Sequence, residues 1–339
     1  METDKYDLGL FNGNVFVNNT FLKTSLGIKN GKIIEIGHIK EKECTKLIDF
    51  SEKYILPGFI DTQVHFREPG LIHKEDIEHG TRSAVLGGIT GIFEMPNTSP
   101  ATINERELLK KINIAKKTSW TNFAFFIGAC KDNIKDLDKL ETIKGCAGIK
   151  IFMGSSTGTL LVSEESDLEL ALKTIKRRVA IHSEDEFRLV ERLKGIDVSK
   201  GVIEHENWRD PETALISTRK VLKYAKKFNT KAHVLHISTY QEMEMLQDKG
   251  DHITVEVTPQ HLTLSSPDCY KRLGTRAQMN PPIRSIVHQN GLWKGIENGT
   301  VDVIGSDHAP HTLSEKENAW PNSPSGMPGV QTMLSVMLN

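Results

Sequence analysis

Residues that could bind a metal or transfer a proton occur at the ends of several short apolar segments. The first segment, GFIDTQVHF, carries Asp61, Gln63 and His65 at every second position, and another, CAGIKIFM, has Lys150 near its centre. Three later segments carry further polar groups toward their ends: His182, His236 and Asp307. Alternate residues of a strand point to the same face, so we expect Asp61, Gln63 and His65 to lie side by side.

These residue types suit a zinc site that activates water. Imidazole nitrogens and carboxylate oxygens are common ligands of Zn²⁺, and a catalytic zinc keeps one position open. Water at that position ionises near neutral pH and can attack an amide carbonyl. Lys150 stands among apolar neighbours, where an ammonium is costly to bury and would repel a metal. Carbamylation by CO₂ would make this lysine an anion whose two oxygens can bridge two metals.

The elements that would position these residues alternate between buried strands and helices. The expected strands are 58–66, 89–96, 122–130, 146–153, 179–185, 231–239, 253–262 and 301–310. Helix-like runs such as PETALISTRKVLKYAKKF separate them. This pattern predicts an α/β fold, a (β/α)₈ TIM-type barrel, although an open doubly wound sheet has the same local pattern. In such a barrel the chemistry lies at the carboxyl ends of the strands.

A different pattern precedes the barrel. From Tyr6 to about Ile36, apolar residues alternate with polar ones, and Asn12-Gly13 and Asn30-Gly31 are typical of hairpin turns. We therefore predict two domains. Residues 1–57 form a small antiparallel sheet, the N-terminal half of a β-sandwich, and residues 58–339 form the barrel.

Composition excludes several other classes of protein. The 339 residues hold 43 Lys+Arg against 44 Asp+Glu, a net charge of −1 that does not suit a nucleic-acid binder acting through bulk charge. No apolar run approaches the ~20 residues of a membrane span, and the start of the chain lacks the order of a signal peptide. The four cysteines contain no C-x-x-C pair, so sulfur-ligated zinc is not expected. We predict a cytoplasmic protein with reduced thiols.

Seven motifs along the chain closely resemble those of dihydroorotases, in the cyclic-amidohydrolase superfamily. They are D-T-Q-V-H-F-R-E-P-G (61–70), E-M-P-N-T (94–98), G-I-K-I-F-M-G-S-S-T-G (148–158), H-S-E-D (182–185), H-I-S-T (236–239), M-N-P-P-I-R (279–284) and S-D-H-A-P-H (306–311). They occur in family order over nearly the whole chain. The resemblance implies a hydrolase that reversibly converts (S)-dihydroorotate to N-carbamoyl-L-aspartate in de novo pyrimidine (UMP) biosynthesis.

The resemblance also implies a role for each matching residue. One or two zinc ions would be held by His65, carbamylated Lys150, His182, His236 and Asp307. Asp307 would also move a proton from the attacking water to the leaving nitrogen. The substrate would be bound by Arg67, Asn97 and His311 at its carboxylate, by Asn280 at the ring, and by backbone groups of Ser325 and Gly326. The expected assembly is a homodimer.

Two departures from the family pattern qualify these expectations. The usual first-strand motif is His-x-His, whereas this chain has Gln63 before His65, and an amide is a poorer zinc ligand. The outer metal then binds weakly, or Asp61, Gln63 or water completes its site, or only one metal is held. A Gln variant with these flanking motifs resembles one subgroup of the family. The chain also ends at Asn339, where relatives continue, so we expect it to lack their C-terminal segment.

Other interpretations remain open at this stage. A different cyclic amidase, such as an allantoinase or hydantoinase, would share the metal ligands, but a clamp built from Arg67 and Asn97 has no purpose without a substrate carboxylate. A catalytically inert relative that acts as a partner of aspartate carbamoyltransferase would account for Gln63. The Gly154–Gly158 loop is expected to be a flexible cover over the site. Histidines away from strand ends, including His205, are expected on the surface or behind the site residues.

Overall fold

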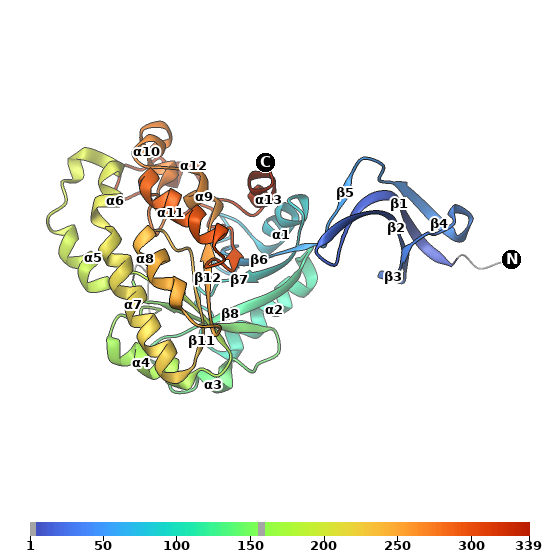
Figure 1. Ribbon diagram of the computed structural model, residues 1–339. Helices are drawn as coiled ribbons and strands as arrows, with labels where there is room; N and C mark the ends of the chain where they lie inside the picture. The colour runs from blue at the N-terminus through green and yellow to red at the C-terminus, as the bar shows by residue number, and fades with distance from the viewer. Residues whose placement is uncertain (1–4, 155–159) are drawn as a thin grey trace. The chain divides into compact units, whose positions relative to one another are not determined.

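The chain folds into two compact units, Met1–Gly58 and Phe59–Asn339 (Figure 1). The computed structural model describes residues 5–154 and 160–339. The expected flexible loop therefore lies, apart from Gly154, outside the described residues.

The first unit is a mixed sheet rather than the purely antiparallel one predicted. Within its described residues the strands are β1 (Tyr6–Val17), β2 (Thr20–Lys29), β3 (Lys32–Gly37), β4 (Cys44–Asp49) and β5 (Tyr54–Ile55). β2 pairs antiparallel with β1 and with β3. β1 pairs parallel with β4 and with β5, because the chain returns to β1 in the same direction after β3.

One of the two predicted hairpin turns is correct. Asn30-Gly31 joins β2 to β3, where Lys29 pairs with Lys32. Asn12-Gly13 instead lies inside β1, at a register shift, and the pairing with β2 continues on both sides of it. The turn from β1 to β2 is Asn18-Asn19, with φ of 48° and 61°. Asparagine tolerates this left-handed conformation, which the common two-residue hairpin turn requires.

The second unit is the predicted barrel. In the described residues its eight parallel strands are β6 (Phe59–Val64), β7 (Ile89–Glu94), β8 (Asn122–Gly128), β9 (Cys146–Phe152), β10 (Arg178–His182), β11 (Lys231–Val234), β12 (Ile253–Val257) and β13 (Val303–Ile304). They pair in chain order from β6 to β13. The first and last strands meet just beyond β13, where the His65 N–H donates to His308 O at 2.7 Å and Val64 bridges His308.

Helices follow most of the barrel strands and surround them (Figure 1). They are α1 (Ile77–Leu86), α2 (Glu105–Thr118), α3 (Leu137–Leu140), α4 (Glu165–Thr174), α5 (Glu186–Leu193), α6 (Glu204–Trp208), α7 (Pro211–Phe228), α8 (Tyr240–Met245), α9 (Pro259–Thr263), α10 (Asp268–Leu273), α11 (Ile286–Glu297), α12 (Leu313–Lys316) and α13 (Met333–Met337). In the part of the chain that is described, none of the helices is long and apolar enough to span a membrane.

Local sequence explains where several of these helices begin. Asp210 accepts a hydrogen bond from Thr213 N, and Pro211 occupies the first turn of α7, whose bounds match the predicted run. Thr258 likewise caps α9. The predicted strand 253–262 therefore ends early, because Thr258 and Pro259 start a helix where the pattern alone suggested more strand.

Strand alternation separates the core from the site. Ile149 and Ile151 of β9 are fully buried in the large apolar cluster that also includes Leu168 and Leu172 of α4. Lys150, between them, points to the opposite face of the strand. The packing of strands against helices therefore directs this lysine toward the barrel axis.

Candidate active site

A polar cavity lies at the carboxyl ends of the barrel strands. Its lining consists of Gln63, His65, Arg67, Asn97, Lys150, Phe152, His182, His236, Asn280, Asp307, Ala309, Ser325 and Gly326. The structure thus brings together all the candidate residues named from the sequence except Asp61 and His311. Phe152 and Ala309 are lining residues that sequence reasoning did not select, because apolar residues at strand ends carry no chemical signal.

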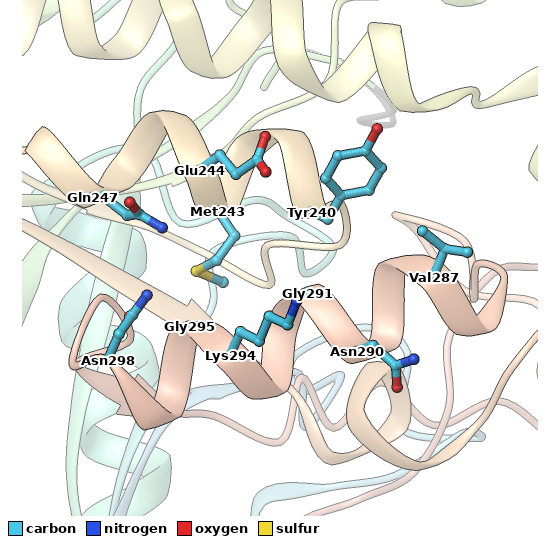
Figure 2. A pocket seen from close by; sticks show the side chains of 10 residues that line it. All are labelled: Tyr240, Met243, Glu244, Gln247, Val287, Asn290, Gly291, Lys294, Gly295 and Asn298. Atoms are coloured by element: carbon cyan, nitrogen blue, oxygen red, sulfur yellow. The ribbon is translucent and has the colours of Figure 1, made fainter.

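Size does not identify this cavity as the site. A larger one, about 360 Å³, lies on the outside of the barrel between α8 and α11. Figure 2 shows Met243 and Tyr240 of α8 beside Gly295 and Gly291 of α11. Neither glycine has room for a side chain, because a Cβ there would clash with Met243 or Tyr240. This groove marks close helix packing, and none of the candidate residues lines it.

His65 is oriented by the residues around it. Its Nδ1 lies 2.7 Å from Asn97 Oδ1, and its Nε2 lies 3.2 Å from Asp307 Oδ1. An amide oxygen only accepts, so Nδ1 carries the proton and Nε2 presents a lone pair toward Asp307. Two acceptors face each other at this point, an arrangement that a cation between them would stabilise.

Two histidines form a second pair of ligand-type groups. His182 Nε2 donates to Glu184 Oε2 at 2.8 Å, which leaves His182 Nδ1 as the acceptor, 3.1 Å from His236 Nε2. The rings meet edge to face, with centroids 4.8 Å apart. Two ligands bound tetrahedrally to one zinc ion stand roughly 3.3 Å apart, so both pairs have suitable spacing.

Glu184 and Arg209 support this pair from behind, and sequence reasoning assigned them no role. Arg209 donates to both oxygens of Glu184, at 3.1 and 2.6 Å, and both side chains are buried. Burial alone would raise the pKa of Glu184, but Arg209 and His182 outweigh it and hold the pKa below its usual value. Glu184 is part of the H-S-E-D motif, but its partner Arg209 lies 25 residues further along the chain. The sequence alone therefore does not show the pairing.

Lys150 lines the same cavity as the two pairs. Its side chain is fully buried, and Nζ has no hydrogen-bond partner among the described residues. Burial lowers the pKa of Lys150, while Asp307 acts in the opposite direction. Burial also lowers the pKa of His65, His182 and His236, and the charge of Lys150 lowers each further.

Asp307 and Gln63 are in direct contact. Gln63 Nε2 donates to Asp307 Oδ1 at 2.9 Å, and Gln63 Oε1 is buried without a partner among the described residues. Burial raises the pKa of Asp307, and Lys150 partly opposes this effect. Asp61 lies outside the cavity lining; its Oδ1 accepts from the N–H groups of Gln63 and Ser306 and so ties β6 to the segment after β13.

Arg67 lines the same cavity and is held by a loop near the end of the chain. Its Nε donates to Pro310 O at 3.0 Å, and its Nη2 lies 3.1 Å from His311 Nε2. His311 is held between Lys74 Nζ and Ser325 O. Burial and the charges of Arg67 and Lys74 lower the pKa of His311 to about 3, so this ring is neutral. His311 therefore supports the wall and does not line the cavity.

The backbone also distinguishes the site. In the described barrel residues, four non-glycine residues have positive φ, and three of them are Arg67 (65°), His236 (36°) and Asp307 (45°). Such conformations cost energy and are found where surrounding structure enforces them, often at functional sites. Gly326 is required for a related reason: its φ is 147°, and a Cβ would clash with Ala309 O.

A search of family models matches residues 54–338 to the amidohydrolase family. The chain belongs to this family. It is 37% identical to a dihydroorotase from Methanosarcina mazei over 98% of the chain and 75% of that protein, and 33% identical to one from Pyrococcus abyssi over 96% and 73%. Among solved structures, the L-hydantoinase (dihydropyrimidinase) from Arthrobacter aurescens superposes with a TM-score of 0.92 at 26% identity, covering 98% of this chain and 77% of the other.

This amidohydrolase is thus dihydroorotase-like, and it spans about three-quarters of the length of these relatives. The described residues contain no group of three His, Cys, Asp or Glu side chains placed to hold one metal ion. They contain two pairs instead, and Lys150 lines the same cavity. A lysine as ammonium is not a ligand, so a metal centre here depends on the chemical form of Lys150.

Replacing Arg209 tests the buried support of the histidine pair. Arg209→Met leaves the Glu184 carboxylate buried without its cation, and we expect the amidohydrolase to lose about 3–5 kcal/mol of unfolding free energy. Chemical denaturation measures the loss. Arg276→Met is the matched control, because Arg276 and Glu317 form an ion pair whose side chains are 57% and 58% exposed. This control should change the unfolding free energy little. The double variant Arg209→Met/Glu184→Met should recover part of the loss; a double variant no more stable than the single one would contradict the assignment.

Proposed function

We propose that this amidohydrolase is a zinc-dependent dihydroorotase that interconverts (S)-dihydroorotate and N-carbamoyl-L-aspartate. The observation that carries the proposal is a single cavity in which two pairs of metal-ligand groups face a buried arginine. The dihydroorotase relatives support the same reaction class. A cyclic amide with a carboxylate substituent would meet the metal-ligand pairs with its amide and Arg67 with its carboxylate.

The residues fit a metal centre on three counts. Lys150 Nζ and Gln63 Oε1 are buried polar atoms without partners in the described chain, which a bound charged group would explain. Both ligand pairs have the spacing of groups that share an ion. The amine of Lys150 could react with CO₂ to form a carbamate. The metal would then be held by His65, Asp307, His182, His236 and that carbamate, as one or two zinc ions.

When bound, zinc would supply a Lewis acid that polarises the amide carbonyl and lowers the pKa of water. The protein's own groups would perform the remaining steps. Asp307 would accept the proton of the attacking water and deliver it to the ring nitrogen as the C–N bond breaks. Gln63 would hold the carboxylate of Asp307 in place through its 2.9 Å hydrogen bond.

Arg67 and its neighbours would bind the substrate carboxylate. Arg67 donates from Nε to Pro310 O, and its Nη1 has no hydrogen-bond partner among the described residues. Asn97 has its oxygen occupied by His65 and can donate from Nδ2. Ser325 and Gly326 line the same side and would bind through backbone groups, while Asn280 would bind the ring.

A hydantoinase is the alternative that a specific observation favours, namely the close superposition on the L-hydantoinase. The two activities differ in the group that Arg67 would meet. Arg67 is only 6% exposed, and among the described residues it has carboxylates such as Asp307 and Glu94 in its surroundings but no direct ion pair. A substrate carboxylate would balance this charge, whereas a hydantoin or dihydrouracil ring has none to offer.

Metal content and substrate choice test the proposal together. We expect the purified chain to contain one or two equivalents of zinc, to hydrolyse dihydroorotate, and to lose activity to a chelator and regain it with zinc. Turnover of dihydrouracil but not dihydroorotate would replace the proposal with a hydantoinase. A folded chain with neither metal nor activity would favour an inert relative, such as a partner of aspartate carbamoyltransferase.

Removing the proton carrier should separate chemistry from metal binding. Asp307→Asn keeps an oxygen beside His65 but cannot accept a proton, so we expect kcat for dihydroorotate to fall by about 10²–10⁴-fold. Zinc content should stay within a factor of two of wild type. Asp302→Asn, at the other end of β13, is the control and should retain activity. Near-normal turnover in Asp307→Asn would exclude the assigned role.

Removing the clamp should affect binding more than turnover. Arg67→Ala deletes a charge-assisted contact, and we expect KM for dihydroorotate to rise about ten- to a hundredfold with a smaller change in kcat. Arg82→Ala serves as the control, because Arg82 stacks on Trp120 at the exposed side of α1. An unchanged KM in Arg67→Ala would remove Arg67 from the substrate clamp.

A further inference from the structure

His205 is a buried histidine that lies behind the site residues. Its sequence position had left a surface location equally open. It belongs to α6, is fully buried, and its Nε2 lies 3.0 Å from Asn280 Oδ1 and 3.0 Å from Met279 O. On its other side, Trp320 Nε1 donates to His205 Nδ1 at 3.2 Å. A hydrogen-bonded chain therefore runs from Trp320 through His205 to Asn280, which lines the cavity.

The partners of this ring determine its protonation. An indole N–H is a donor only, so His205 Nδ1 must accept and carries no proton. A backbone carbonyl is an acceptor only, so Nε2, facing Met279 O, must carry the proton. Both neighbours thus select the same neutral tautomer. The pKa of His205 agrees, because burial and the charge of Arg209 lower it to about 3.

The tautomer in turn orients the Asn280 amide. Because His205 Nε2–H donates, the atom of Asn280 that faces it must be the oxygen. The amide nitrogen then has no partner among the described residues and is the end that Asn280 can present to the cavity. A 180° flip of the Asn280 amide would place two donors against each other and would lose the contact.

We propose that His205 and Trp320 are positioning residues that hold Asn280 with its N–H₂ toward the ligand, so that the site selects a ring with a hydrogen-bond acceptor at this point. This inference rests on the proposed function for the identity of the ligand, a cyclic ureide whose carbonyl oxygen would accept. A ligand with an N–H at the same place would be rejected, since two donors would meet.

Trp208 provides a natural comparison within the same cluster. Both indoles pack edge-on against the His205 ring, with centroids 5.8 Å away for Trp208 and 6.4 Å for Trp320. Trp208 Nε1, however, donates to Leu189 O and not to His205. Trp208→Phe therefore removes an indole N–H from the same packing without changing the partners of the imidazole.

A double-mutant cycle distinguishes positioning from general structural support. We expect His205→Phe to raise KM for dihydroorotate about tenfold, with kcat changed less, because one oriented hydrogen bond to the ligand is lost. In an Asn280→Ala background the same substitution should have no further effect on KM. Trp320→Phe should raise KM in the same direction, while Trp208→Phe and the remote His288→Phe should not.

Additive effects of His205→Phe and Asn280→Ala on KM, or equal effects of Trp320→Phe and Trp208→Phe, would overturn the inference.

The tautomer of His205 is measured independently of activity, by long-range ¹⁵N–¹H NMR of the histidine rings in the full chain. We expect a His205 signal with Nε2 protonated and Nδ1 unprotonated, assigned by its absence in His205→Phe. The opposite tautomer would overturn the inference. A wild-type chain that fails to hydrolyse dihydroorotate would overturn the proposed function alone, and the NMR result would still decide the orientation of His205.

Discussion

The burial of Lys150 is the constraint on which the rest of the site depends. An ammonium without a partner in a closed barrel is unstable, so its surroundings must either neutralise it or convert it to something else. His65, His182, His236 and Asp307 line the same cavity, and the charge of Lys150 lowers the pKa of each histidine. Each of these groups is itself costly to bury alone. A metal centre with a modified lysine would satisfy them together, which is why we regard them as one unit.

A common device orients the groups around this cavity. Asn97 accepts from His65, Glu184 accepts from His182, and Gln63 donates to Asp307. Gln63 contacts the same Asp307 oxygen, Oδ1, that lies near His65, and so holds that carboxylate in place. Asn97 and Glu184 each occupy one nitrogen of a histidine ring and so decide which nitrogen is left to accept. His205 does the same for Asn280. The hydrogen-bond partners of the cavity residues thus determine what the cavity can recognise, because a partner at one end of a hydrogen-bonding group limits the choices left to the other end.

Most of the barrel could be predicted from the sequence, because buried parallel strands and amphipathic helices leave strong local patterns. The predicted run 211–228 matches α7, whose Asp210 cap and Pro211 mark its start. Local signals misled where a longer-range pairing decided the outcome. Asn12-Gly13 is a good turn sequence, yet β1 passes through it because pairing with β2 on both sides outweighs the local preference. The return of the chain to β1 as a parallel neighbour also leaves no local signal.

The sequence by itself determined which residue types stand at the strand ends, since strand alternation puts Gln63 and His65 on one face and Lys150 opposite its apolar neighbours. Only the tertiary structure decided which of these side chains reach the cavity. It placed Asp61 as a backbone tie, turned His311 into a support, and brought Arg209 to Glu184 and His205 to Asn280 across gaps of 25 and 75 residues. The physical reason is that a hydrogen bond depends on distance and direction in space, and spacing along the chain specifies these only within a single strand or helix.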